Sequence, residues 1–173
     1  MIVRICEQKK KGGMYLNVLL NIYTVSFFGH REVTRFAFIE KQLIKIIKDL
    51  LDANEYVVIL VGRNGEFDQL VSSVIHRVKR LYGDNNCFHT LVLPYRSAEY
   101  RDKEESFIEF YDNVEICNEF GNTHFKAAIQ KRNRLMVDRS DLTVFYIEHE
   151  YGGAYKTYKY AVRQQKKTIK LTV

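Results

Sequence analysis

The sequence of 173 residues contains no tryptophan, one proline and three cysteines. With so little proline, a Pro-rich linker is excluded, and no internal domain boundary is visible. Cys6, Cys87 and Cys117 lie far apart and form no CxxC pair, so the sequence indicates neither a zinc site nor a disulfide framework. This cysteine usage favours a reducing cytoplasm, and we expect neither a bound metal nor a cofactor.

Long hydrophobic runs are also missing, and none approaches the length that crosses a bilayer. The apolar stretch Met14–Phe28 follows Lys9–Lys11, but it lacks a small-residue cleavage site and continues into a strand-like segment, unlike a signal peptide. We therefore expect a basic N-terminal extension over residues 1–20, a single domain over residues 21–173 and no membrane partner.

Hydrophobic residues make up 46% and charged residues 28% of the chain, a balance typical of a globular domain and not of a disordered one. The formal net charge is +6, which favours an anionic partner such as a nucleotide or a nucleic acid. A basic, solvated surface without any partner would give the same charge.

Apolar runs of strand length alternate with helical patterns along the chain. The expected strands are Ile22–Phe28, Tyr56–Val61, His89–Leu93, Leu142–Ile147 and Thr168–Val173, with a weaker one at Val114–Cys117. Between them, apolar residues recur three and four positions apart, which predicts amphipathic helices. The clearest helical face is Phe36, Ile39, Leu43, Ile46 and Leu50. This order predicts an α/β fold with an open, mostly parallel sheet and helices on both faces.

In such a sheet, ligands bind beyond the carboxyl ends of the strands, and polar clusters follow the expected strands at these ends. The residues of these clusters that we expect to bind the ligand are Gly29, His30 and Arg31; Gly62, Arg63, Asn64, Gly65 and Asp68; Pro94 and Tyr95; and Gly152, Gly153 and Ala154. In the first cluster, Gly29 leaves the backbone open to close approach, and the side chains of His30 and Arg31 can donate hydrogen bonds to an anion.

Gly152 and Gly153 open a helix, so that unpaired backbone N–H groups could bind a phosphate or carboxylate with no side chain in the way. A tight loop that needs a positive φ would explain the two glycines equally well. Neither a Walker loop nor a GxGxxG fingerprint is present.

Glu66 and Asp68 lie at the start of a predicted helix. Carboxylates there could accept ribose hydroxyls, and one could act as general acid/base or nucleophile. Alternatively, both acids only stabilise the helix start through its dipole. Because Asp68 is the better N-cap candidate, Glu66 is the candidate catalytic residue.

Arg132 and Arg134 belong to a basic run on the helix before the strand Leu142–Ile147. Arg132 shares a helix face with Met136, which brings one guanidinium near the apolar side of the helix. A guanidinium held there suits bidentate contact with a phosphate. Most basic helical runs, however, are simply solvated.

Five segments in order, VSFFGHR, LVGRNGEFD, LVLPY, KRNRLMVDRSDLTVFYI and GGAYKT, are similar to the SLOG superfamily. This superfamily includes the cytokinin-activating phosphoribohydrolases, the core of DNA-processing protein A, and small bacterial and phage proteins that the sequence most resembles, in the YpsA-like branch. The resemblance covers Ile22–Val173. It implies a Rossmann-like three-layer fold, a nucleotide-derived ligand and, often, a homodimer.

The resemblance also implies individual site residues. Arg132 matches the active arginine of the phosphoribohydrolases, Met136 their methionine, Asp141 their aspartate, and Gly152 and Gly153 their paired glycines; Arg134, Ala154 and Thr157 lie in the same two segments and complete the expected ligand-binding set. Lys159, however, occupies the position of the catalytic glutamate, and Tyr155 and Lys156 stand where Gly-Thr is expected. These departures argue against the chemistry of that group.

Three functions are compatible with these residues. The first is binding of a nucleotide or an ADP-ribose-like ligand, as a sensor or a sequestering protein. The second is cleavage of an N-glycosidic bond in a nucleotide, with Glu66 as nucleophile or acid/base and Arg132 as phosphate anchor. The third, which we rank last, is nucleic-acid binding, with tyrosines stacking on bases; the candidates are Tyr151, Tyr155, Tyr158 and Tyr160.

Overall fold

The structure is a computed structural model that describes residues 2–4, 19–83, 86–117 and 124–172. Its strands are β1 Ile2–Arg4, β2 Leu19–Gly29, β3 Tyr56–Val61, β4 Cys87–Leu93, β5 Asn113–Ile116, β6 Leu142–Tyr146 and β7 Lys167–Lys170. Its helices are α1 Phe36–Ala53, α2 Glu66–Tyr82, α3 Ala98–Asp102, α4 Glu104–Phe110, α5 Phe125–Arg139 and α6 Gly152–Arg163.

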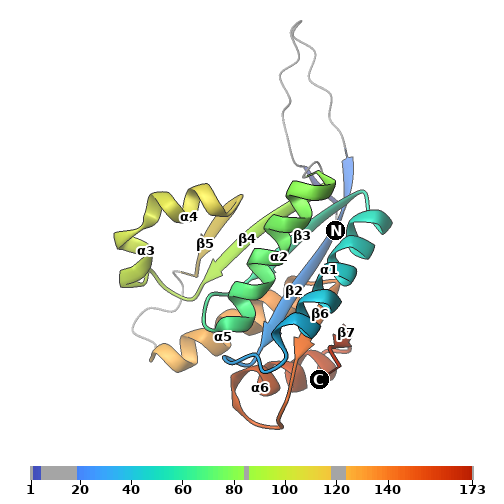
Figure 1. Cartoon of the computed structure of the whole chain (residues 1–173). Helices are drawn as coiled ribbons and strands as arrows, with labels where there is room; N and C mark the ends of the chain where they lie inside the picture. Colours follow the sequence, from blue (N-terminus) through green and yellow to red (C-terminus); the bar gives the residue numbers. More distant parts are fainter. Residues whose placement is uncertain (1, 5–18, 84–85, 118–123, 173) are drawn as a thin grey trace, which may run out of the picture.

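The strands form one sheet in the order β5-β4-β3-β2-β6-β7, and all neighbours along this path are parallel. Helices α1 and α2 cover one face, and α5 and α6 cover the other (Figure 1). The predicted α/β fold, a mostly parallel sheet between two helical layers, is therefore confirmed. Because β2 lies between β3 and β6, the strand order reverses beside β2, and such a switch point is where ligands bind in open α/β sheets.

All six predicted strands are present, with ends shifted by a few residues. Strand β2 begins at Leu19, inside the expected extension, and β1 pairs antiparallel with its first residues. The short elements β1, α3 and α4 were not predicted, because three to seven residues are too few to show a periodicity. Within the described ranges, no helix is long and apolar enough to cross a bilayer.

The buried face of α1 is rotated slightly from the predicted one. The buried residues are Ile39, Leu43, Ile47 and Leu51, four apart along the helix. Phe36, predicted to be part of this face, is 52% exposed at the first helical position. Ile46 and Leu50 pack at the margin of the core.

His89, on β4, is enclosed in the core beneath α2 and α4. Its side chain is 1% exposed, and neither ring nitrogen has a hydrogen-bond partner in the described structure. The ring centroids of His76, Phe110 and Tyr111 lie 5.9, 6.2 and 4.6 Å away. Burial is the main cause that lowers the pKa of His89 to about 3; His76 and Lys79 lower it further, whereas Asp112 raises it. The ring is therefore neutral near pH 7.

His89 makes the stability of the fold depend on pH. Its pKa is lowered from 6.5 to about 3 by folding, so between these values only the unfolded chain binds the proton. Unfolding is therefore favoured as the pH falls below 6.5, at about 1.4 kcal/mol per pH unit. We expect denaturant titrations to show that, between pH 7.5 and 5.0, the free energy of unfolding falls by about 2 kcal/mol less in His89→Phe than in the wild type. Equal losses would show that His89 is protonated in the folded state.

Candidate functional site

The loops that follow β2 and β6 meet at the switch point. The His30 N–H donates to the Tyr146 carbonyl at 3.3 Å, and the Glu148 N–H donates to His30 Nδ1 at 3.3 Å. Thr34 binds the same region, because its N–H donates to the Tyr146 hydroxyl at 3.1 Å and its hydroxyl donates to Glu148. These bonds fix the two loops relative to each other.

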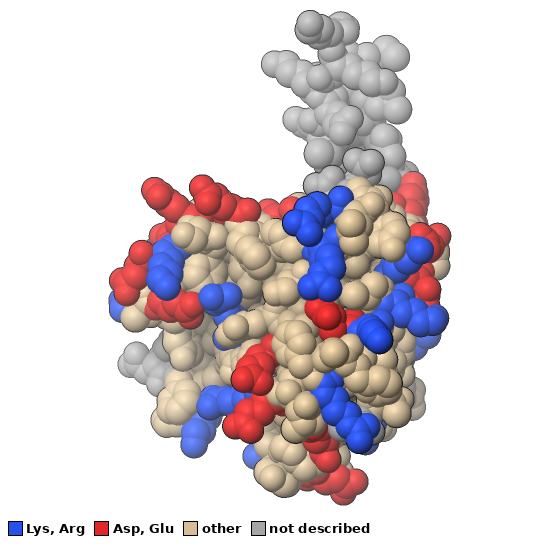
Figure 2. All heavy atoms as spheres, in the orientation of Figure 1, with Lys and Arg blue, Asp and Glu red and all other residues tan. Residues whose placement is uncertain are grey.

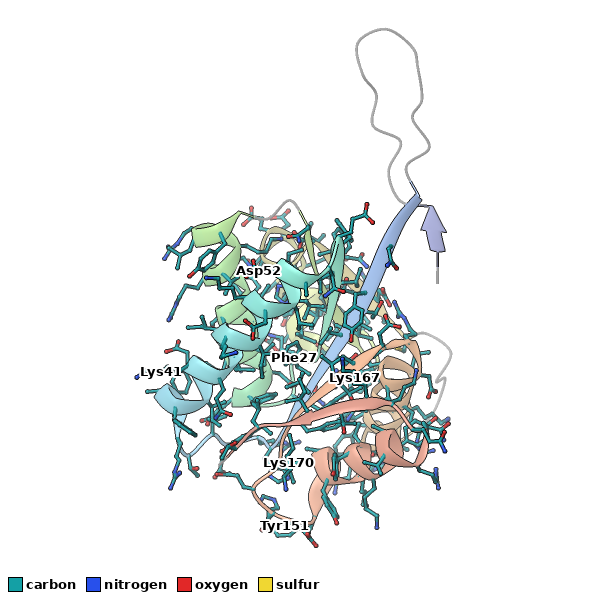
Figure 3. All side chains as sticks on the ribbon, turned by 90° about the vertical axis from the view of Figure 1, so that its right-hand side faces the viewer. Phe27, Lys41, Asp52, Tyr151, Lys167 and Lys170 are labelled. Atoms are coloured by element: carbon teal, nitrogen blue, oxygen red, sulfur yellow. The ribbon has the colours of Figure 1, made fainter. Side chains whose placement is uncertain are left out.

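A ladder of aromatic rings runs from the core to the surface between these loops. Phe67 stacks on Tyr146 with centroids 5.4 Å apart, and Tyr146 contacts the edge of His30 at 6.4 Å. His30 stacks on His149 at 3.6 Å, and His149 lies 3.8 Å from Tyr151. We call these five residues the aromatic ladder. Its last ring, Tyr151, is 70% exposed and lies in the loop before α6 (Figure 3).

His30 is held in its neutral form. Burial is the main cause that lowers its pKa, and the neighbouring His149 lowers it further, although the Tyr151 backbone and Glu148 oppose the shift. Because Nδ1 accepts the Glu148 N–H, the proton of the neutral ring is on Nε2. That buried Nε2 has no partner of good hydrogen-bonding geometry among the described residues.

Helix α6 begins beside the ladder with an open N-terminus. Tyr151 is its N-cap residue and provides no side-chain hydrogen bond. Gly152 has a φ of +85°, which a residue with a side chain would adopt only under strain. The tight-loop explanation of Gly152 is therefore confirmed, and phosphate binding by these N–H groups remains a prediction.

Glu66 fastens the loop after β2. Its carboxylate accepts the Val33 N–H at 3.0 Å, and its own N–H donates to the Arg31 carbonyl at 2.7 Å. Gly65 makes this contact possible, because a Cβ there would lie 2.6 Å from the Cα of Arg31. The carboxylate proposed for catalysis thus has a structural hydrogen bond in this structure.

The space beside the glycines at two strand ends is filled by side chains of the protein itself. A Cβ on Gly29 would lie 2.3 Å from the Phe67 ring. A Cβ on Gly62 would lie 2.3 Å from Arg132 Nη1 and 2.8 Å from Asp68 Oδ2. Both glycines are therefore required for packing.

Arg132 and Asp68 meet at Gly62 from opposite faces of the sheet. Arg132, on α5, is 3% exposed, and its Nη1 donates to the Val92 carbonyl at 3.1 Å. Asp68, on α2, accepts the Asn64 N–H at 2.7 Å. The predicted N-cap role of Asp68 is wrong, because Gly65 is the N-cap residue and Asp68 instead reaches back from the first turn.

The two charges stabilise each other against desolvation. Burial raises the pKa of Asp68, while Arg132 and the Asn64 N–H oppose this shift. Burial lowers the pKa of Arg132, and Asp68 opposes that shift. An arginine remains protonated in proteins, so the guanidinium is a buried cation whose nearest acidic partner is Asp68.

A small cavity lies between the ends of β3 and β4. Its lining includes Arg63, Asn64, Pro94 and Tyr95, and its volume is about 110 Å³. Arg63 is already paired there with Glu99 at 2.9 Å. The volume is far below the roughly 300 Å³ at which enclosed small-molecule sites begin.

Three predicted ligand-binding residues do not face this edge of the sheet. Asp141 precedes β6 at the opposite end, where its carboxylate accepts the Thr24 N–H at 2.8 Å. Arg134 lies on the outer surface of α5, with its guanidinium 5.3 Å from the ring centre of Tyr160. Thr157 is buried between the helices and bonds to Asn133 at 3.0 Å.

His149 was missed by the sequence analysis, although it lies in the polar cluster after β6. Nothing in a local pattern shows that this loop meets the one after β2, because the pairing depends on the strand order. The signal that could have found it is the density of aromatic residues in the segment HEYGG.

Gly62 offers a test of the buried pair. Gly62→Ala places a methyl group against Arg132 and Asp68, and we expect a loss of about 1–3 kcal/mol in the free energy of unfolding. Gly153→Ala is the matched control, because its Cβ would meet only the end of the Gln130 side chain, at 3.1 Å. Denaturant titration that found both variants equally stable would contradict this packing.

Comparison with solved structures finds proteins of similar fold. DNA processing protein A from Helicobacter pylori, described for its single-stranded DNA binding mode, superposes with a TM-score of 0.63 at 17% identity, over 87% of this chain and 66% of that one. The Streptococcus pneumoniae protein superposes with a TM-score of 0.61 at 15% identity, over 88% of this chain and 51% of that one. The chain thus spans about two thirds and about half of the lengths of these proteins. No family model and no curated protein matches the sequence. The chain therefore has the Rossmann-like fold of the DNA processing protein A structures.

Proposed function

We propose that the chain binds single-stranded nucleic acid at the carboxyl edge of its sheet, with a base stacked on Tyr151. The observation that carries this proposal is the position of one exposed ring. Tyr151 ends the aromatic ladder and is also the N-cap residue of α6, so a stacking surface and an open helix N-terminus adjoin.

The ladder makes Tyr151 a better platform than an ordinary surface tyrosine. His149 packs against one side of the ring at 3.8 Å, and His149 is itself stacked on the buried His30. A side chain that is already ordered loses little rotamer entropy on binding. Stacking of a base on an aromatic ring contributes about 1–3 kcal/mol and tolerates any base.

Phosphate groups have donors within the same region. The first N–H groups of α6 point out of the helix and carry the positive end of its dipole. The ring of His30 is buried beneath His149, so it supports this region but offers no donor at the surface. The similarity in fold to the Helicobacter pylori protein, described for its single-stranded DNA binding mode, supports the same partner class.

A polymer suits this edge better than an enclosed nucleotide. The cavity beside Arg63 is about 110 Å³, whereas Tyr151 at the start of α6 lies on the open surface. Binding of a free nucleotide-derived ligand stays an alternative, since it would use the same ring and helix start. The N-glycosidase alternative requires Glu66 to release the Val33 N–H. A homodimer remains a prediction of the resemblance.

Tyr151 allows a direct test by fluorescence anisotropy with a labelled oligothymidylate. We expect Tyr151→Ala to weaken binding about tenfold, because one stacked base is lost. The control is Tyr82→Ala, which removes another exposed tyrosine, 57% exposed, from the C-terminal end of α2.

Two results would contradict the proposal. One is equal affinity of the Tyr151→Ala and Tyr82→Ala variants for the oligonucleotide. The other is an affinity for adenosine monophosphate as high as that for the oligonucleotide, which would identify a nucleotide site instead.

A further inference from the structure

The loop that presents Tyr151 lacks the charge that attracts nucleic acid. Glu148 and Glu150 flank His149, and the segment from Ile147 to Gly153 contains no lysine or arginine. Affinity for a phosphodiester chain comes largely from the release of counterions at lysine and arginine contacts. The cations that hold the strand must therefore lie outside this loop.

Positive charge is concentrated in the last part of the chain. Residues 124–173 contain eleven Lys and Arg but only four Asp and Glu. Residues 19–117 contain twelve Lys and Arg and fifteen Asp and Glu. On the face formed by α1 and α2, charges of both signs are interspersed (Figure 2). Helix α6 contains no acidic residue at all.

The cations of α6 lie along one exposed line. Lys156, Lys159 and Arg163 are three and four positions apart, which places them on one side of the helix. The opposite side is buried through Ala154, Thr157 and Ala161, so the three cations face solvent. We call them the α6 stripe. It starts one turn after Gly152, beside the stacking ring.

Among the described residues, acids near α6 do not pair with the cations of the α6 stripe, although Glu150 lies near Tyr155 on this helix. Within the described part of the chain, no salt bridge involves a residue of α6. At its far end, the guanidinium groups of Arg163 and Arg134 lie 5.6 and 5.3 Å from the ring centre of Tyr160. Asp138 accepts the Tyr160 hydroxyl there at 2.9 Å.

We infer that the α6 stripe, extended by Arg134, binds the phosphodiester backbone of a single strand whose base stacks on Tyr151. This inference rests on the proposed function. The strand enters at the open N-terminus of α6 and follows the helix toward Arg163, about 16 Å at 1.5 Å per residue. Lys156, Lys159 and Arg163 contact phosphates and carry no sequence information, whereas Tyr151 accepts any base.

The salt dependence of oligothymidylate binding tests the stripe. For single strands, the slope of log K against log salt changes by about 0.7 for each phosphate contact. We expect the triple variant K156Q/K159Q/R163Q to lower the magnitude of this slope by about 2 and to weaken binding at least tenfold at low salt. The matched control is K41Q/R80Q/K103Q, which removes the same charge from three exposed cations outside α5 and α6.

The outcomes distinguish the role of the α6 stripe from that of Tyr151. If the two triple variants bind alike while Tyr151→Ala is impaired, the stripe is overturned and the proposed function stands. If the wild type binds no oligonucleotide, the proposed function fails and the stripe fails with it. If only the α6 triple variant loses binding to phosphatidylserine vesicles, with oligonucleotide affinity unchanged, the stripe faces a membrane and the inference is wrong. Circular dichroism confirms that both triple variants fold.

Discussion

One buried cation connects the two helical layers of this protein. Arg132 extends from α5 to the end of β3, where Gly62 leaves room for it, and faces Asp68 from α2 on the other side of the sheet. Neither charge would be tolerated in such a place alone, because an unpaired buried charge costs several kcal/mol. Asp68 on α2 and Arg132 on α5 therefore each offset part of the other's cost of burial. With α2 fixed, Glu66 can hold the loop after β2, and Phe67 can support the aromatic ladder.

The aromatic ladder connects this buried region to the exposed ring of Tyr151. Each ring is placed by the one beneath it, from the buried Phe67 through Tyr146 and the histidines to the exposed Tyr151. In the proposed complex, two parts of the molecule contact the single strand. The loops at the switch point supply stacking and N–H donors, whereas the outer side of α6 supplies charge. This division explains how a loop with two glutamates can adjoin a basic surface.

Much of the sheet could be predicted because its strands are short apolar runs with clear ends. Tyr56–Val61 was predicted to the residue, since Gly62 ends the run. At Gly29 the sequence predicted a bare backbone for a ligand, whereas the structure places the Phe67 ring against it. Arg132 lies against Gly62 in the same way. Both neighbours come from other elements and leave no local signal. Asp141 was placed at the site through the resemblance alone, and the structure shows it at the opposite end of β6. The stacking of His149 on His30 depends on strand order, which a single sequence does not encode in any window.

Photochemical cross-linking would test the central claim most directly. A single-stranded oligonucleotide carrying 5-iodouracil, irradiated in complex with the full chain and mapped by peptide mass spectrometry, reports which side chains lie against the bases. We expect the main cross-link on Tyr151, because stacked aromatic rings react with this base. Cross-links confined to α1 and α2, or to Tyr95 beside the small cavity, with none on Tyr151, would contradict it.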